Sequence, residues 1–330
     1  MRRGPQGVVA VVTGASSGIA RATALALARR GASVVLAARS EDSLREVADR
    51  CVAVGGRALA VPTDVAVEED VQRLARRASD AFGRIDVWIN AAAVMAYGGF
   101  EDIPAAEYRH VVETNLFGQV HGARAVLPHF RRQGRGVLIN VGSVWGHVTS
   151  PYVSPYVVSK FGVRAFSECL QEGLRLGRDK DIHVCLVLAQ SVDTPIFRHA
   201  GNYTGTLPKP IPPIVNPQRV VKAILGCVEH PRRQVTVGWW GRMLELGHAV
   251  TPAFYSRVVP EAMNMLAFGR EPAAPTPGNI YEPMPQWNQT TGDWRDKRRA
   301  AARAAVLVGA AATTAAVTRS LRRSNAVAEP

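Results

Sequence analysis

Short apolar runs alternate with longer stretches of helical spacing through the first 190 residues, and this alternation limits the folds open to the chain. The expected strands are Val8–Thr13, Ser33–Ala38, Ala58–Pro62, Ile85–Asn90, Gly136–Val141 and His183–Ala189. The expected helices between them are Ile19–Arg30, Ser43–Val54, Glu68–Phe82, Ala105–Arg132 and Ser154–Gly177. Strands that are apolar along their whole length and separated by helices are typical of a parallel sheet covered on both faces. The pattern therefore predicts an α/β fold with a doubly wound parallel sheet.

The pattern changes after the sixth expected strand. Residues 190–217 contain six prolines and are expected to form a surface loop. A helix over residues 217–229 follows, with Asn216 as its cap and a proline in its first turn. Gln234–Gly238 is expected to add a further strand. The sheet should therefore have about seven strands, which is a Rossmann-like arrangement.

Three regions are expected along the chain. Residues 1–240 form the Rossmann-like domain, including the loop 190–217. Residues 241–294 form a helical and irregular C-terminal extension, with helical spacing over 242–268 interrupted at Pro252 and Pro260, followed by a Pro-rich arm. Residues 295–330 form a basic, alanine-rich helical tail.

Composition narrows the class of protein. With 47% hydrophobic residues in 330, the chain can bury a sizeable core, which excludes a disordered protein. The four cysteines lie far apart without metal-ligand spacing, so neither a disulfide framework nor a metal site is expected. The net charge of +13 comes without any nucleic-acid-binding motif and does not indicate a nucleic-acid partner.

No uninterrupted apolar run reaches the roughly 18 residues of a membrane-spanning helix, and no signal peptide is evident, so we expect a cytoplasmic protein. The tail leaves two alternatives open. Basic clusters at both ends of residues 295–323 would suit contact with an anionic membrane surface. The same segment could instead be a frayed helix or pack on a partner subunit.

A glycine-rich turn, Thr13-Gly14-Ala15-Ser16-Ser17-Gly18-Ile19-Ala20, joins the first strand to the first helix. Such a turn lets backbone amides approach a pyrophosphate, which then lies at the positive end of the helix. A tight turn without a ligand is the alternative. The second strand ends at Arg39, whose guanidinium would suit a 2′-phosphate and hence NADP rather than NAD. Arg39 could otherwise pair with Glu41 or Asp42.

Tyr156 and Lys160 lie one helical turn apart, so a phenol and an ammonium share a helix face. A nearby cation is expected to lower the pKa of the phenol from about 10 towards neutrality. Ser143 closes the fifth strand, at the sheet edge where ligands gather. Asn115 lies in the middle of an expected helix, where asparagine is unfavourable and needs a reason.

Together these motifs resemble the short-chain dehydrogenase/reductase family over about residues 7–240. The resemblance implies that Asn115, Ser143, Tyr156 and Lys160 form the catalytic set, with Asn115 positioning a water that links Lys160 to solvent. It also implies cofactor contacts from Thr13, Gly14, Ser16, Ser17, Gly18, Ile19, Arg39, Asp64, Val65, Asn90, Ala91, Ala92, Tyr156, Lys160, Val192 and Thr194. The implied function is an NADP(H)-dependent oxidoreductase that interconverts a carbonyl and an alcohol, assembled as a homodimer or homotetramer through 105–132 and 154–177.

The chain departs from the family pattern at three places. Ala20 replaces a glycine of the turn, and Ala91 and Ala93 replace residues of an Asn-Asn-Ala-Gly motif. After the sixth strand, Ala189-Gln190 stands where the family has Pro-Gly. These departures motivate an alternative function, a nucleotide-binding regulator or scaffold with weak or lost chemistry.

The loop after the sixth strand is rich in apolar side chains and is expected to cover a lipid-like, steroid-like or aromatic small molecule. Alternatively, these side chains only pack the loop onto the domain. Arg198, His199 and Lys209 could meet an acidic substrate, but we expect them to face water. The candidate substrate contacts are Ser143, Trp145, Tyr152, Gln190 and Phe197.

Overall fold

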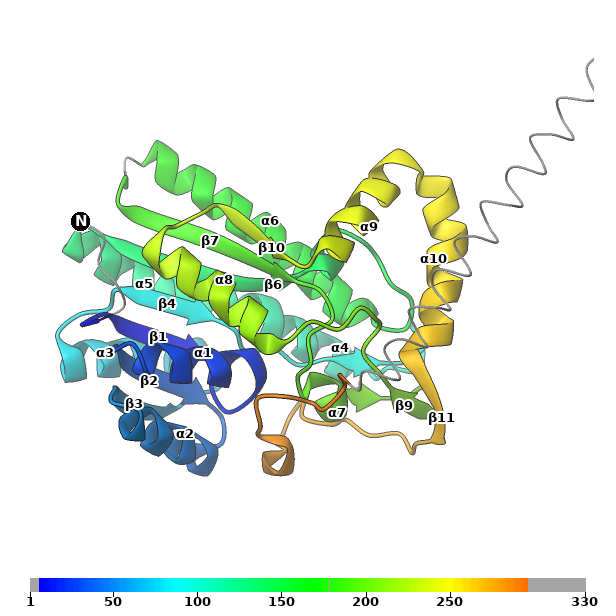
Figure 1. Cartoon of the computed structure of the whole chain (residues 1–330), viewed down its shortest axis with the longest axis horizontal. Helices are drawn as coiled ribbons and strands as arrows, with labels where there is room; N and C mark the ends of the chain where they lie inside the picture. The colour runs from blue at the N-terminus through cyan, green and yellow to red at the C-terminus, as the bar shows by residue number, and fades with distance from the viewer. Residues whose placement is uncertain (1–5, 178, 296–330) are drawn as a thin grey trace, which may run out of the picture.

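A parallel sheet of seven strands forms the centre of the computed structural model, which describes residues 6–177 and 179–295 (Figure 1). The strand order is β10-β7-β6-β4-β1-β2-β3, and every neighbouring pair is parallel. The strands are β1 (Val9–Thr13), β2 (Ser33–Ala38), β3 (Arg57–Pro62), β4 (Val87–Asn90), β6 (Gly136–Ser143), β7 (Ile182–Ala189) and β10 (Gln234–Val237). This confirms the predicted doubly wound α/β fold.

Two layers of helices cover the sheet (Figure 1). One apolar core joins the sheet to α1 (Gly18–Ala28), α2 (Glu41–Ala53) and α8 (Pro217–Glu229). A second core on the opposite face joins it to α3 (Glu68–Phe82), α5 (Gly118–Gln133) and α6 (Ser154–Leu176). All five residues of β1 are buried, as expected for a strand covered on both faces. At roughly 1.5–3 kcal/mol per buried Val, Leu or Ile side chain, these two cores provide the main stabilisation of the domain.

The chain moves from β3, at one edge of the sheet, back across β1 to β4. The strand order therefore reverses between β1 and β4, and the connections on the two sides lead away from each other. In open α/β sheets, a crevice forms at this point, outside the carboxyl ends of the strands. The fold thus determines where a ligand would lie before any side chain is considered.

The expected helix over 105–132 is interrupted. It consists of α4 (Ala105–Val112), a π-helical turn (Glu113–Phe117) and α5. The loop 190–217 is also more ordered than predicted, because it contains α7 (Ile196–His199), β8 (Gly201–Asn202) and β9 (Thr206–Pro208). β8 pairs with the short β5 (Ala96–Tyr97) in a separate small sheet.

The C-terminal extension begins with α9 (Trp239–Val250) and α10 (Pro252–Ala267). Pro252 stands in the first turn of α10, as a helix-starting proline should, but Pro260 lies inside α10 and does not end it. β11 (Phe268–Pro272) then pairs antiparallel with β9, and the chain returns towards the glycine-rich turn (Figure 1). The predicted tail beyond Arg295 lies outside the described residues. Within the described part of the chain, no helix combines the length and hydrophobicity needed to span a membrane.

Candidate active site

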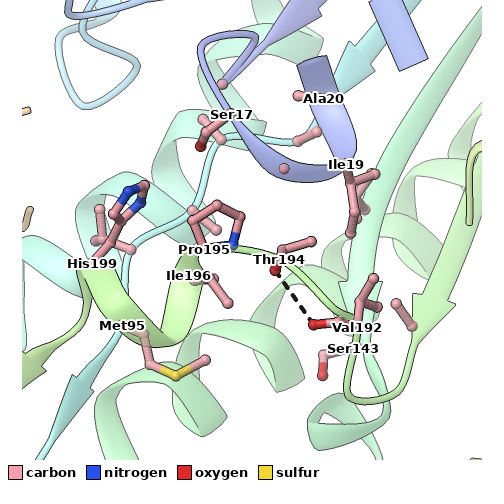
Figure 2. Close-up of a pocket in the computed structure, with 18 of the residues that line it drawn as sticks. Ser17, Ile19, Ala20, Met95, Ser143, Val192, Thr194, Pro195, Ile196 and His199 are labelled. Atoms are coloured by element: carbon pink, nitrogen blue, oxygen red, sulfur yellow. Dashed lines mark hydrogen bonds between the residues drawn. The ribbon is translucent and has the colours of Figure 1, made fainter. Parts of the chain in front are cut away.

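A single cleft follows the carboxyl ends of β1, β2, β4, β6 and β7. Its walls come from the glycine-rich turn, the segment after β4, the ends of β6 and β7, and the start of α6. Figure 2 shows Ser17 and Ile19 of the turn facing Val192, Thr194 and Pro195, which follow β7, with Ser143 below them. Two groups of residues far apart in the sequence therefore form the two sides of one site.

The glycine-rich turn is fixed by its contact with the loop after β4. Gly14 has a φ of +73°, and a Cβ there would lie 2.7 Å from the Cα of Ala92. The hydroxyl of Thr13 accepts hydrogen bonds from the backbone amides of Ala91 (3.1 Å) and Ala92 (3.3 Å). Only glycine fits this approach, which brings the backbone of the turn close to Ala92 where it leads into the first turn of α1.

Thr13 and Asn90, two of the expected cofactor contacts, are not among the described residues that line the cleft. They support the residues that do. Asn90 is buried, accepts from the Trp88 indole (2.8 Å) and donates to Asn140 (2.9 Å). Asn140 in turn donates to the hydroxyl of Ser167 on α6 (2.9 Å). This buried network holds β4, β6 and α6 in register, so the structure gives Asn90 a supporting position rather than direct access to a ligand.

Ser143, Tyr156 and Lys160 meet at one end of the cleft. The Lys160 ammonium lies 5.4 Å from the centre of the Tyr156 ring and donates to the carbonyl of Val141 (3.0 Å). The ring of Trp145 packs edge-on against Tyr156 at 5.8 Å. The predicted shared face of α6 therefore brings the phenol and the ammonium together beside the end of β6.

Burial controls the titration of this cluster. Burial raises the pKa of Tyr156 to about 12, and a hydrogen bond with Ser143 opposes that rise. Burial lowers the pKa of Lys160 to about 8. The predicted lowering of the Tyr156 pKa by Lys160 is therefore wrong for the protein alone, because desolvation of the phenolate exceeds the stabilising contacts. Tyr156 stays protonated at neutral pH and can act as a proton donor.

Asn115 lies in the π-helical turn and is completely buried. Its side chain accepts from the amide of Val94 (2.8 Å) and donates to the Val94 carbonyl (2.9 Å) and to the Ser159 hydroxyl (3.0 Å). It thus fastens the segment after β4 to α6, next to Lys160. A π-helical turn is a frequent feature of functional sites and explains why asparagine is accommodated within the helix. The water that Asn115 is expected to position stays a prediction.

Arg39 lies at the opposite end of the cleft, with Asp64 and Val65. It pairs with neither Glu41 nor Asp42, both of which bind Arg45 instead. The Arg39 guanidinium donates to three carbonyls of the C-terminal extension, at Asn279 (2.5 Å), Ile280 (2.8 Å) and Tyr281 (2.6 Å). Both of its terminal nitrogens are therefore engaged by backbone acceptors.

The end of the cleft beyond Tyr156 is mostly apolar. Trp145 and Phe197 line it as predicted, and so do Ile196 and Ile211 of the loop that was expected to cover a substrate. Met95, Trp240 and Leu244 line it as well, although the sequence did not single them out for the site. Gln190 also lines it, donating to the Pro213 carbonyl (2.8 Å), while its Oε1 finds no partner among the described residues. Tyr152 instead packs edge-on against Phe268 at 5.4 Å, beside a separate small hollow.

Two of the three residues expected to face water are engaged in the structure. His199 is buried at the cleft, burial lowers its pKa to about 4, and its Nε2 has no partner among residues 6–177 and 179–295. Arg198 is exposed, as expected, but it also donates to the carbonyl of Gly292 (3.2 Å) and lies over the rings of Trp287 and Trp294. The apolar residues around them in sequence gave no indication of this, because the partners come from the distant C-terminal extension.

Comparison with known proteins agrees with this geometry. A family model described as short chain dehydrogenase matches residues 8–203. The uncharacterized oxidoreductase YxnA of Bacillus subtilis is 35% identical over 269 residues, covering 81% of this chain and 75% of the relative. An uncharacterized oxidoreductase of Staphylococcus saprophyticus is 36% identical over 196 residues, covering 59% and 78%.

The fold comparison points the same way. A short-chain type dehydrogenase/reductase from Mycobacterium marinum superposes with a TM-score of 0.62 at 25% identity, covering 71% of this chain and 95% of that one. The extent of the family match and the identity to YxnA go beyond a shared fold. The chain therefore belongs to the short-chain dehydrogenase/reductase family of NAD(P)-dependent oxidoreductases.

Proposed function

We propose that this protein is an NADP(H)-dependent oxidoreductase that interconverts a carbonyl group and an alcohol on an apolar small molecule. The observation that carries the proposal is the meeting of Ser143, Tyr156 and Lys160 at one end of a cleft whose other side is the glycine-rich turn. The glycine turn fits a dinucleotide, because Gly14 keeps the backbone close to Ala92 and the turn leads directly into the N-terminus of α1.

The chemistry divides between cofactor and protein. The nicotinamide, when bound, supplies or accepts the hydride at the carbonyl carbon. The Tyr156 hydroxyl donates a proton to the carbonyl oxygen during reduction and takes one back during oxidation. The Ser143 hydroxyl hydrogen-bonds that oxygen and stabilises the charge that develops on it. Lys160 holds positive charge beside the phenol, with its ammonium fixed by the Val141 carbonyl.

An apolar substrate is supported by the far end of the cleft. The side chains of Trp145, Ile196, Phe197 and Leu244 surround the space beyond Tyr156. Desolvating a lipid-like, steroid-like or aromatic carbonyl compound there would contribute to its binding.

The proton donor can be tested by Tyr156→Phe. This change should lower turnover of a panel of apolar ketones and aldehydes at least a thousandfold, while NADPH affinity stays within threefold. Tyr255→Phe is the matched control, because Tyr255 belongs to the same apolar cluster but is not part of the cleft that the described residues line. Turnover by Tyr156→Phe above a tenth of the wild-type rate would refute the assignment.

The preference for NADP rests on Arg39, the cation at the end of β2. A guanidinium has five N–H donors, and the bonds to the carbonyls of residues 279–281 use three of them, so a 2′-phosphate can accept from the others while the carbonyl contacts stay. Arg39→Gln should reduce the ratio of kcat/KM for NADPH over NADH at least tenfold. An unchanged ratio would leave the oxidoreductase proposal standing and refute the NADP preference.

We further propose that the chain forms a homodimer or homotetramer through the long helices. Phe117, Val158 and Phe161 leave 48%, 49% and 37% of their surfaces exposed on the π-helical turn and α6. Burying them in a subunit interface would remove apolar area from water. Phe161→Glu should lower the mass measured by analytical ultracentrifugation, and an unchanged assembly would refute this interface.

We also propose that the protein is cytoplasmic and contacts a membrane surface through residues 295–323. Cosedimentation with anionic liposomes compares the full chain with one ending at residue 294. Equal pelleting of the two forms would refute the tail as an anchor.

A further inference from the structure

The last part of the described chain, Asn279–Trp294, runs along the cleft from one end to the other, and we call it the C-terminal arm. Its first residues bind Arg39 at the end near β2 through the three backbone carbonyls described above. This segment lies outside the part of the chain that the short chain dehydrogenase family model matches, residues 8–203.

The middle of the arm contacts the glycine-rich turn and the helices behind it. The carbonyl of Gln289 accepts a hydrogen bond from the amide of Gly18 (2.8 Å), the first residue of α1. The carbonyl of Asn288 accepts from Arg21 (2.7 Å), and the Asn288 side chain donates to the Ser43 hydroxyl (2.5 Å). The arm is thus fixed directly beside the turn that is expected to receive the pyrophosphate.

The end of the arm is attached to the loop after β7. A buried carboxylate oxygen of Asp193 accepts from the amides of Gly292 (3.1 Å) and Trp294 (2.9 Å). The indole of Trp294 donates to the Thr194 carbonyl (3.0 Å), and Arg198 lies 4.6 Å from the centre of the Trp294 ring. Asp193 stands between Val192 and Thr194, two of the residues that are expected to contact the cofactor, so this attachment lies next to them.

The arm also takes part in the wall of the cleft. Asn279, Met284 and Asn288 line it, together with His199, whose carbonyl accepts from the Asn279 amide (2.7 Å). The His199 ring bonds to the Trp287 backbone, and because its Nε2 has no partner in the described chain, Nδ1 makes that bond. Burial lowers the pKa of His199 to about 4, so this ring in the cleft wall is neutral at pH 7.

We propose that the C-terminal arm is the outer wall of the dinucleotide site, that it closes over the bound cofactor along its length, and that it must detach at Asp193 and Trp294 before the cofactor leaves. The inference rests on the proposed function. The arm is attached at three places along the cleft, at Arg39, Gly18 and Thr194, and these attachments carry the inference. A bound dinucleotide would place its 2′-phosphate, its pyrophosphate and its nicotinamide beside them in the same order. His199, in the same wall, adds a buried polar atom that has no partner among the described residues.

Cofactor dissociation without substrate tests the attachment. Stopped-flow fluorescence measures the release of NADPH and of NADH from the wild type, Trp294→Ala and Arg198→Ala. Neither residue belongs to the lining of the cleft formed by the described chain, so each change loosens the arm without removing a cofactor contact. Both variants should release either dinucleotide about tenfold faster, which corresponds to about 1.4 kcal/mol. Trp294→Phe keeps a ring and should recover part of the effect.

Arg45→Ala is the matched control, because Arg45 is exposed and forms its ion pairs with Glu41 and Asp42 within α2. Its release rates should equal those of the wild type. Release from Trp294→Ala and Arg198→Ala within twofold of the wild type, with binding intact, would overturn the arm as a closing wall. Failure of the wild type to bind either dinucleotide would overturn the proposed function and the inference with it.

Hydrogen exchange of the wild type gives a second test that needs no variant. If the arm closes over the cofactor, peptides covering residues 279–294 should exchange more slowly when NADPH or NADH is added. If these peptides exchange faster on addition, the arm competes with the cofactor and is displaced by it, and the proposal is wrong. Peptides from α3 serve as the internal reference because they lie away from the cleft.

Discussion

Replacing Lys160 by methionine should stabilise the protein while abolishing its activity. Lys160 has 2% of its surface exposed, and burial lowers its pKa from 10.5 to about 8. At about 1.36 kcal/mol per pH unit, keeping this side chain charged at pH 7 costs the folded state about 3 kcal/mol. Methionine has a similar length and no charge, so Lys160→Met removes that cost.

The lost hydrogen bond offsets part of the gain. Lys160 donates to the Val141 carbonyl, but the same carbonyl also accepts from the Gln119 amide (3.2 Å) and stays satisfied in the variant. The loss should therefore stay near the roughly 1 kcal/mol of an ordinary hydrogen bond. The net expectation at pH 7 is a gain of about 2 kcal/mol in the free energy of unfolding.

The pH dependence separates this explanation from a general packing effect. Between pH 8 and 10.5 the unfolded state of the wild type binds more protons at Lys160 than the folded state, so wild-type stability rises with pH there. The advantage of Lys160→Met should therefore shrink by about 2 kcal/mol between pH 7 and 9.5. The range stops at pH 9.5 because Tyr156, with its pKa raised to about 12, gives the opposite slope above pH 10.

Urea denaturation followed by far-UV circular dichroism, without cofactor, measures both values. Lys222→Met, at an exposed position of α8, is the matched control and should change stability by less than about 0.5 kcal/mol at either pH. A Lys160→Met protein that is less stable than the wild type at pH 7 would refute the reasoning. A difference that is the same at pH 7 and 9.5 would show that the gain does not come from the buried charge.

Three further changes have defined outcomes. Gly14→Ala should weaken NADPH binding at least tenfold in a fluorescence titration, whereas Gly134→Ala, which has a similar φ (+72°) but open space around it, should leave binding unchanged. Gly122→Ala, whose Cβ would lie 2.3 Å from a buried oxygen, should cost about 2–3 kcal/mol in urea denaturation, whereas Gly173→Ala, in an open helical position, should gain about 0.5–1 kcal/mol. His199→Phe should make the free energy of unfolding depend less on pH below pH 6.5. The folded-state pKa of His199, about 4, lies below its unfolded value, so the wild type loses about 3 kcal/mol as the pH falls from 6.5 to 4. An equally steep loss in the variant would contradict this.

Local sequence patterns were sufficient for the sheet and for the cluster around Tyr156. Apolar runs define buried strands, and the spacing of Tyr156 and Lys160 defines a shared helix face whatever the rest of the chain does. The position of Ser143 could also be predicted, because it ends a strand and the carboxyl ends of parallel strands lie at the sheet edge where ligands bind. The π-helical turn could not be predicted in the same way, since its only sign is Asn115, a residue that is unfavourable in helices generally.

Contacts that depend on distant parts of the chain were not predictable. The sequence places Arg39 at a strand end, but its acceptors come about 240 residues later, from the C-terminal arm. The same holds for Arg198, whose partners Trp287 and Trp294 lie in a stretch without periodicity. Pro- and aromatic-rich segments bind through single carbonyls and rings, and such contacts leave no repeating pattern in the sequence.

The alanines that replace residues of the Asn-Asn-Ala-Gly motif change the structure little, because backbone groups make the contacts at these positions. The amides of Ala91 and Ala92 bind the Thr13 hydroxyl, and an amide serves equally well under alanine, asparagine or glycine. Ala93 needs no glycine, since Tyr152 and Asp293 are the only described non-glycine residues with positive φ. These substitutions therefore give little support to a regulator without chemistry. Gln190 remains the departure with a structural consequence, because it adds a side chain to the cleft wall where the family pattern has glycine, and that side chain donates to the Pro213 carbonyl (2.8 Å).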